Sequence, residues 1–285
     1  MKDYKNYIFD LYGTLLDICT DERKSSLWKL LAEQYNVYGC EWSGKKLAEA
    51  FWKDDFEERQ KCRREKKIAH PEIRLENVFA RLFFECPKTH GSTAMIAGKS
   101  VDKLREMYAG KDKEKALKIV AESEFNFFML NLFRVHSRKF MRPYKNTIPV
   151  LKELKERGKG VYLLSNAQRI FTYPEIEQSG ILPYFDAIYI SSDFEMMKPQ
   201  KEFMEALLKG EGLKKSECVM VGNDPDSDFR VAVRNGMDSI LLNTWDWSAQ
   251  KIKKTTGEII KAEGADKKLM PHVIMSGDIA EILYN

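Results

Sequence analysis

The most regular pattern along the chain is a series of short apolar runs, each bounded by polar turns. Runs of this length predict buried strands. From residue 161 onward they alternate with helical segments such as 200–207 and 228–235, which is the rhythm of βαβ units. The pattern predicts an α/β fold with a doubly wound parallel sheet. The six runs are Tyr7–Phe9, Val161–Leu164, Ala187–Ile190, Cys218–Val221, Ser239–Leu242 and His272–Met275.

The long stretch between the first two predicted strands has a different character. It is rich in Leu, Phe, Ala, Glu and Lys and carries no comparable strand signal. Pro71 stands where it can open a helix, and apolar residues from Leu75 to Leu82 recur at helical spacing. Inserted there, a helical segment would project beyond the carboxyl edge of the sheet as a cap. We therefore expect a sheet domain of residues 1–19 and 141–285 and an all-helical cap domain of residues 20–140.

Composition and charge narrow the possible partners. Lys and Arg total 47 against 43 Asp and Glu, and a formal net charge of +4 does not indicate a nucleic-acid partner. No signal-peptide pattern and no membrane-spanning apolar stretch is present, so we expect a cytoplasmic protein without a membrane partner. The 5 cysteines are scattered and suggest neither disulfides nor zinc. Oligomeric state has no sequence signal.

Candidate chemistry gathers where predicted strands end. Polar side chains that follow parallel strands meet at one edge of the sheet, so residues far apart in the chain are expected to lie together there. Alone, each of these side chains is better explained without a catalytic role: Lys198 as an exposed lysine before a proline, and the others as turn or helix-cap residues. Their recurrence after strand upon strand favours a shared site. The candidates are Asp10, Tyr12, Gly13 and Thr14, then Ser165 and Asn166, then Lys198, and finally Asn223, Asp224 and Asp228.

Four motifs in this order resemble those of the haloacid dehalogenase (HAD)-like hydrolase superfamily. They are DLYGT from Asp10, Ser-Asn at 165 and 166, Lys198 before a helix, and GNDPDSD from Gly222. The resemblance covers residues 7–9 and about 143–283, whereas the cap matches only in position and helical character. It implies a Rossmann-like core with a cap, in which Asp10 attacks the substrate and forms a covalent intermediate.

The same residues suggest roles that agree with this chemistry. Lys198 and a bound Mg²⁺ would neutralise charge on an anionic substrate. Ser165 and Asn166 would donate hydrogen bonds to the transferring group, beside Gly13 and Thr14 in the substrate site. Oxygen ligands for Mg²⁺ are expected from Asp10, the backbone carbonyl of Tyr12, Asn223 or Asp224, and Asp228. The choice between Asn223 and Asp224 stays open.

Tyr12 departs from the family's phosphatase pattern, which has a second Asp as general acid and base at this position. A phenol can donate a proton but is a poor base at neutral pH. Our leading hypothesis is a Mg²⁺-dependent phosphatase of a small phosphorylated metabolite, supported by the acidic fourth motif. The D-x-Y-G-T pattern with Ser-Asn is similar to that of metal-independent 2-haloacid dehalogenases, which are the first alternative. A HAD-fold binding protein with little turnover is the second.

Overall fold

The computed structural model describes residues 2–284 and contains a six-stranded parallel sheet. Its strand order is β10-β9-β8-β1-β6-β7. Every predicted strand is confirmed to within one residue at either end, because parallel strands covered on both faces give continuous apolar runs, most clearly in the buried strands β1, β6, β8 and β9. The strands are β1 (Asn6–Phe9), β6 (Gly160–Ser165), β7 (Ala187–Ile190), β8 (Cys218–Gly222), β9 (Asp238–Leu242) and β10 (His272–Ile274).

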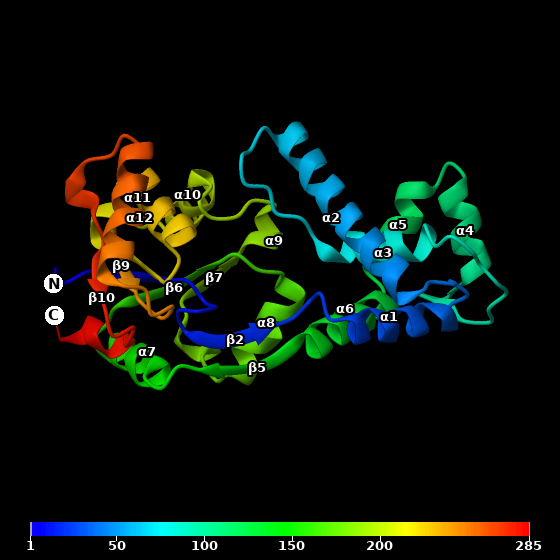
Figure 1. Cartoon of the computed structure of the whole chain (residues 1–285), viewed down its shortest axis with the longest axis horizontal. Coiled ribbons are helices and arrows are strands. Elements are labelled where there is room, and N and C mark those ends of the chain that lie inside the picture. Colours follow the sequence, from blue (N-terminus) through cyan, green and yellow to red (C-terminus); the bar gives the residue numbers. More distant parts are fainter. Residues whose placement is uncertain (1, 285) are drawn as a thin grey trace. The chain divides into compact units, whose positions relative to one another are not determined.

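Helices cover both faces of this sheet, as a doubly wound fold requires. Phe9 and Val221 belong to the apolar cluster that includes Leu151 of α7, and Ile8 points to the other face, in the cluster of Phe203 on α10. Figure 1 shows α7 and α10 on opposite sides of the strands. The helices are α7 (Thr147–Glu156), α8 (Arg169–Gln178), α9 (Ser191–Phe194), α10 (Lys201–Gly210), α11 (Arg230–Asn235) and α12 (Ala249–Ala262).

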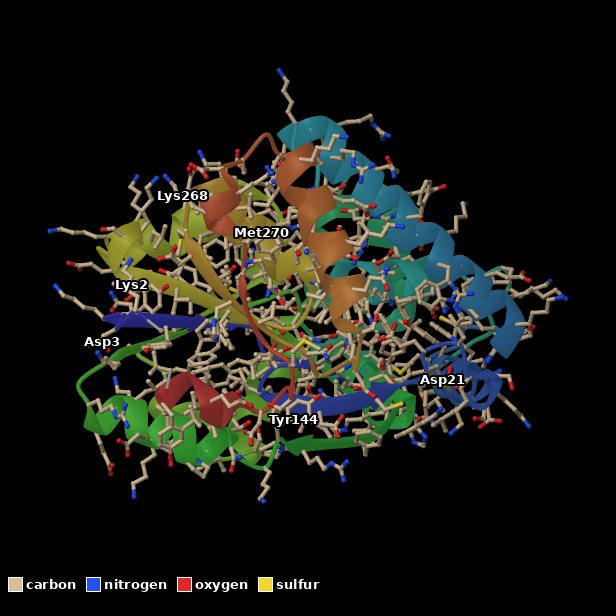
Figure 2. All side chains as sticks on the ribbon, turned by 60° about the vertical axis from the view of Figure 1, so that its left-hand side comes forward. Lys2, Asp3, Asp21, Tyr144, Lys268 and Met270 are labelled. Atoms are coloured by element: carbon tan, nitrogen blue, oxygen red, sulfur yellow. The ribbon has the colours of Figure 1, made fainter. Side chains whose placement is uncertain are left out.

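The central strand β1 runs from the edge of the sheet where its strands begin to the edge where they end. Lys2 and Asp3 lie at its amino end (Figure 2). Asp10 follows Phe9 at its carboxyl end, where the Asp10 backbone N–H donates to Val221 O at 2.9 Å. The parallel register thus brings the ends of β1, β6 and β8 to the same edge, because all three run in the same direction.

A second, two-stranded sheet was not predicted. It pairs β2 (Leu16–Thr20) with β5 (Arg138–Pro143). Both strands are half exposed and carry polar and charged positions, so they lack the apolar runs that mark the main sheet. The chain leaves the sheet domain through β2 and returns to it through β5.

The described chain divides into two compact units. The sheet unit comprises residues 2–18, 68–72 and 140–284, and the inserted unit comprises 19–67 and 73–139. The expected cap of 20–140 therefore lacks one internal segment, because residues 68–72 hydrogen-bond to the sheet unit. Pro71 does not open a helix, contrary to the prediction: it forms an antiparallel bridge with Met196.

The inserted unit is helical apart from one short hairpin of β3 (Met95–Ile96) and β4 (Lys99–Ser100), which the all-helical expectation missed. Its core is aromatic: the ring of Phe51 lies 4.9 to 5.7 Å from the rings of Trp28, Phe79 and Phe133. Among residues 2–284, no helix is both long enough and apolar enough to cross a membrane. The helices are α1 (Ser25–Val37), α2 (Gly44–Lys66), α3 (Leu75–Phe84), α4 (Val101–Ala109), α5 (Lys113–Ala121) and α6 (Glu124–Ser137).

Candidate active site

A buried lysine between two carboxylates forms the centre of the site. Lys198 Nζ lies 2.7 Å from Asp10 Oδ1 and 2.8 Å from Asp228 Oδ1, and its side chain is fully buried. Burial alone would lower the pKa of Lys198, but the two carboxylates outweigh it and raise that pKa. Lys198 therefore stays positively charged next to Asp10.

The Asp10 carboxyl is held in a setting that disfavours its charge. Burial, assisted by the nearby Asp228, raises the pKa of Asp10 from 3.8 to about 6, while Lys198 and a hydrogen bond from Thr14 oppose the rise. At neutral pH the carboxylate is ionised and poorly solvated. A desolvated carboxylate whose charge is balanced by one lysine is suited to act as a nucleophile.

The turn after Asp10 brings the first and fourth motifs together. Thr14 Oγ1 lies 3.0 Å from Asp10 Oδ2 and 3.1 Å from Asn223 Oδ1. Gly13 has φ +86°, and a Cβ there would lie 2.4 Å from Asn223 Nδ2, so only glycine fits this close approach. Thr244 Oγ1 donates to Gly13 O at 2.7 Å and holds the turn from the β9 side.

The second motif supplies one available hydroxyl and one structural clamp. Ser165, the last residue of β6, is fully buried, and its hydroxyl has no hydrogen-bond partner within residues 2–284. Asn166 instead binds the backbone of Lys198: its Oδ1 accepts from Lys198 N at 2.7 Å and its Nδ2 donates to Lys198 O at 2.9 Å. Asn166 thus positions Lys198, and Ser165 is the better candidate for contacting a substrate oxygen.

The carboxylates of the fourth motif hold their own loop. Asp228 Oδ2 accepts the backbone N–H groups of Asn223 and Asp224, both at 3.0 Å. Asp224 caps the following turn by accepting from Asp226 N at 2.9 Å and Ser227 Oγ at 3.0 Å. Burial first, and then the Asp228 charge, raise the pKa of Asp224. Most acceptor positions of these two carboxylates are therefore already in use.

The oxygens available to a cation lie nearer Asp10. Within residues 2–284, no three His, Cys, Asp or Glu side chains are grouped so as to hold a metal ion. However, Asp10 Oδ2 and Asn223 Oδ1 both approach the single hydroxyl of Thr14, whose one proton cannot satisfy both at once. These two oxygens converge without a full set of donors, so they fit a hard cation that accepts a neutral oxygen ligand.

Tyr12 uses its hydroxyl away from the Asp10–Lys198 pair. The ring packs against the apolar cluster on one face of the sheet. The hydroxyl hydrogen-bonds to Thr172 Oγ1 at 3.2 Å and to Glu175 Oε2, both on α8. Glu175 is only 3% exposed. Sequence reasoning missed Glu175, because a glutamate inside a helix far from every motif gives no signal of this contact.

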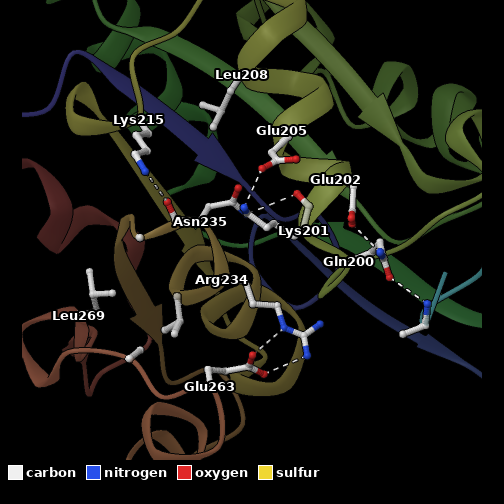
Figure 3. Close-up of a pocket in the computed structure, with 14 residues that line it drawn as sticks. Gln200, Lys201, Glu202, Glu205, Leu208, Lys215, Arg234, Asn235, Glu263 and Leu269 are labelled. Atoms are coloured by element: carbon white, nitrogen blue, oxygen red, sulfur yellow. Dashed lines mark hydrogen bonds and ion pairs between the residues drawn. The ribbon is translucent and has the colours of Figure 1, made fainter. Parts of the chain in front are cut away.

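A cavity of about 750 Å³ in the sheet unit is lined by residues outside the candidate active site (Figure 3). Arg234 crosses its wall, paired with Glu263 at 2.9 and 3.0 Å and donating to Pro199 O at 2.9 Å. None of the predicted site residues lines it. The Arg234 contact nevertheless ties α11 to the backbone immediately after Lys198.

Comparison with known proteins agrees with this arrangement. The family model described as haloacid dehalogenase-like hydrolase matches residues 4–236. The chain belongs to this family, as its four motifs predicted.

Two curated relatives and one solved structure illustrate the likeness. A glyceraldehyde 3-phosphate phosphatase of Methanocaldococcus jannaschii is 36% identical over 102 residues, covering 36% of this chain and 45% of the relative. A protein of the same name from Methanothermobacter thermautotrophicus is 29% identical over 150 residues, covering 50% and 66%. The chain thus spans about half to two thirds of the relatives' length. The 2-haloacid dehalogenase of Pseudomonas syringae pv. Tomato matches with TM-score 0.57, 18% identity and 98% coverage of both chains, which shows the shared fold.

Proposed function

We propose that this protein hydrolyses small, anionic phosphorylated metabolites with Asp10 as the nucleophile. The observation that carries the proposal is Lys198, buried between Asp10 and Asp228 at 2.7 and 2.8 Å. A fixed positive charge keeps Asp10 ionised in a buried site and offsets the repulsion between a carboxylate and a phosphate. The relatives named glyceraldehyde 3-phosphate phosphatase support the same class of substrate.

The chemistry follows from the groups that line the site. An oxygen of Asp10 attacks phosphorus, and the bond from phosphorus to the leaving oxygen breaks with its electron pair. The leaving oxygen takes a proton from solvent. The buried hydroxyl of Ser165 donates to an oxygen of the transferring group. Water then attacks phosphorus in the aspartyl phosphate, which releases phosphate and restores the Asp10 carboxylate.

We assign the Mg²⁺ ligands to Asp10, Asn223 and the backbone carbonyl of Tyr12. Bound there, Mg²⁺ would supply positive charge to the phosphoryl oxygens. Asn223 is favoured over Asp224 because Asn223 Oδ1 and Asp10 Oδ2 converge on the Thr14 hydroxyl, whereas the two Asp224 oxygens bind the Asp226 N–H and the Ser227 hydroxyl of their own loop. Asp228 is then a residue that positions Lys198 and the loop.

The test is hydrolysis of p-nitrophenyl phosphate by the full chain, with Mg²⁺ and with EDTA, beside Asp10→Asn. We expect turnover that needs Mg²⁺ and falls to the background in Asp10→Asn. Glu177→Ala, an exposed change on α8, is the matched control and should match the wild type. Full turnover by Asp10→Asn would refute the proposal.

A second candidate is hydrolysis of a carbon–halogen bond through an ester on Asp10. It is favoured by Tyr12, because its hydroxyl is bonded to α8 and a halide leaves without needing a proton. Release of halide from a short 2-haloacid in EDTA, without phosphatase activity, would support it. Absence of turnover on both substrate classes would favour a binding protein.

A further inference from the structure

A segment from within the inserted stretch is built into the sheet unit beside the catalytic lysine. Residues 68–72 run antiparallel to the backbone that precedes Lys198. Met197 N donates to His70 O, and Glu72 N donates to Glu195 O, both at 3.0 Å. The position of Lys198 therefore depends on a chain segment more than 120 residues away in sequence.

The adjoining helix adds a third connection to the same segment. The side-chain oxygen of Gln200, labelled in Figure 3, accepts the backbone N–H groups of Ala69 and His70, both at 3.2 Å. Gln200 directly precedes α10 and lies two residues after Lys198. The strap of residues 68–72 is thus bonded on both sides of Lys198.

Glu72 extends this strap toward the second motif. Its side chain belongs to a residue only 4% exposed, and its Oε2 accepts from the fully buried Ser191 Oγ at 2.9 Å. Ala167 N, directly after Asn166, donates to the same Ser191 Oγ at 2.8 Å. Glu72, Ser191 and Ala167 thus form a short chain of buried hydrogen bonds.

Glu72 determines which way the Ser191 hydroxyl points its proton. A hydroxyl has one proton, so Ser191 accepts from Ala167 N and sends its own proton elsewhere. Two acceptors lie near: Glu72 Oε2 at 2.9 Å and Ala167 O at 3.1 Å. A carboxylate is the stronger acceptor. Drawing the proton to Glu72 turns a lone pair of Ser191 toward Ala167 N.

We propose that Glu72 is a positioning residue for the active site. Through Ser191 it holds the loop that follows Ser165 and contains Asn166, and Asn166 in turn holds the Lys198 backbone at 2.7 and 2.9 Å. The alternative is that a buried glutamate merely stabilises the fold. A positioning role predicts a local change in hydrogen exchange and in kcat when the carboxylate is removed, whereas a purely stabilising role predicts a change throughout the sheet unit.

The experiment compares the full chain with Glu72→Ala, Glu72→Gln, Ser191→Ala and the double variant, with exposed Glu177→Ala as control. Amide hydrogen exchange of the peptide containing Ala167 reports the loop directly. Glu72→Ala removes a buried charged hydrogen bond. We therefore expect the exchange rate at this peptide to rise, and kcat for p-nitrophenyl phosphate to fall, each by roughly 10- to 100-fold. Glu72→Gln keeps an acceptor and should recover most of both.

The expected pattern is local and non-additive. Exchange should rise at 165–169 and 196–200 but not across the sheet, KM should change little, and the double variant should be no worse than either single one. Unchanged exchange and kcat in folded Glu72→Ala, or exchange raised uniformly through the sheet unit, would overturn the proposal. The kinetic arm rests on the proposed function. If the wild type does not hydrolyse the probe, the proposed phosphatase fails and the exchange arm alone decides on Glu72.

Discussion

Replacing Asp10, the proposed nucleophile, should stabilise the folded protein, and by an amount that depends on pH. In Asp10→Asn the side chain keeps its shape but cannot ionise, while Lys198 retains Asp228 as a partner at 2.8 Å. In the wild type, burying the ionised Asp10 carboxylate costs free energy of folding, since folding raises the pKa of that carboxyl from 3.8 to about 6. The substitution removes this cost together with the proposed nucleophile.

The size of the effect follows from the same pKa shift. A group whose pKa is raised by folding binds its proton more tightly in the folded state. It therefore stabilises the folded state at pH values below its unfolded pKa. This stabilisation is lost as the pH rises through its folded pKa. For Asp10, ionisation between about pH 4 and 6 costs the wild type about 3 kcal/mol. For a chain of 285 residues that is roughly 5 °C in Tm.

Thermal unfolding of both proteins in EDTA from pH 4.5 to 8 measures this difference. EDTA removes divalent cations that would stabilise the ionised Asp10. We expect Asp10→Asn to melt above the wild type at pH 8, with the gap closing as pH falls below 6. Melting temperatures that stay parallel over this range, or a wild type that is more stable at pH 8, would refute the reasoning.

Three further substitutions test other parts of the site. Lys198→Met leaves two buried carboxylates without their cation, so it should lower the free energy of unfolding by about 3–5 kcal/mol in urea titrations and abolish turnover. A decrease in that free energy of less than about 1 kcal/mol is typical of an exposed ion pair and would contradict a buried one. Tyr12→Phe should lower stability by about 1–3 kcal/mol. Its kcat should fall far less than the roughly 100-fold expected on losing a general acid, and a larger drop would make Tyr12 the acid. Asn223→Asp should lower the Mg²⁺ concentration that half-saturates turnover, and an unchanged metal requirement would exclude position 223 as a ligand.

The main sheet was predictable because its four central strands, β1, β6, β8 and β9, are almost entirely buried. Such strands appear in sequence as continuous apolar runs. The half-buried β7 has an apolar run as well and was predicted with its observed bounds, Ala187–Ile190. Strands β2 and β5 were missed because their exposed, polar positions resemble loops. Pro71 was misassigned to a helix because it pairs with Met196, a contact between residues that are distant in sequence.

The site was predictable as a set of residues but not as a geometry. Parallel topology alone places Asp10 and Lys198 at one edge, whereas the Asp228 contact to Lys198 at 2.8 Å depends on how the fourth-motif loop folds. Glu72 and Glu175 carried no signal, because each makes its contact through a tertiary hydrogen bond from a linker or a helix. Buried carboxylates of this kind become visible only when the fold is known.

The covalent intermediate offers the most direct test of the central claim that Asp10 is the nucleophile. The 285-residue protein, turning over p-nitrophenyl phosphate with Mg²⁺, is quenched in acid within milliseconds and digested. The mass of the peptide that contains Asp10 is then measured by mass spectrometry. We predict a fraction of this peptide heavier by one phosphoryl group in the wild type and none in Asp10→Asn. Steady turnover with an unmodified Asp10 peptide, or a phosphoryl group on another residue, would contradict the account.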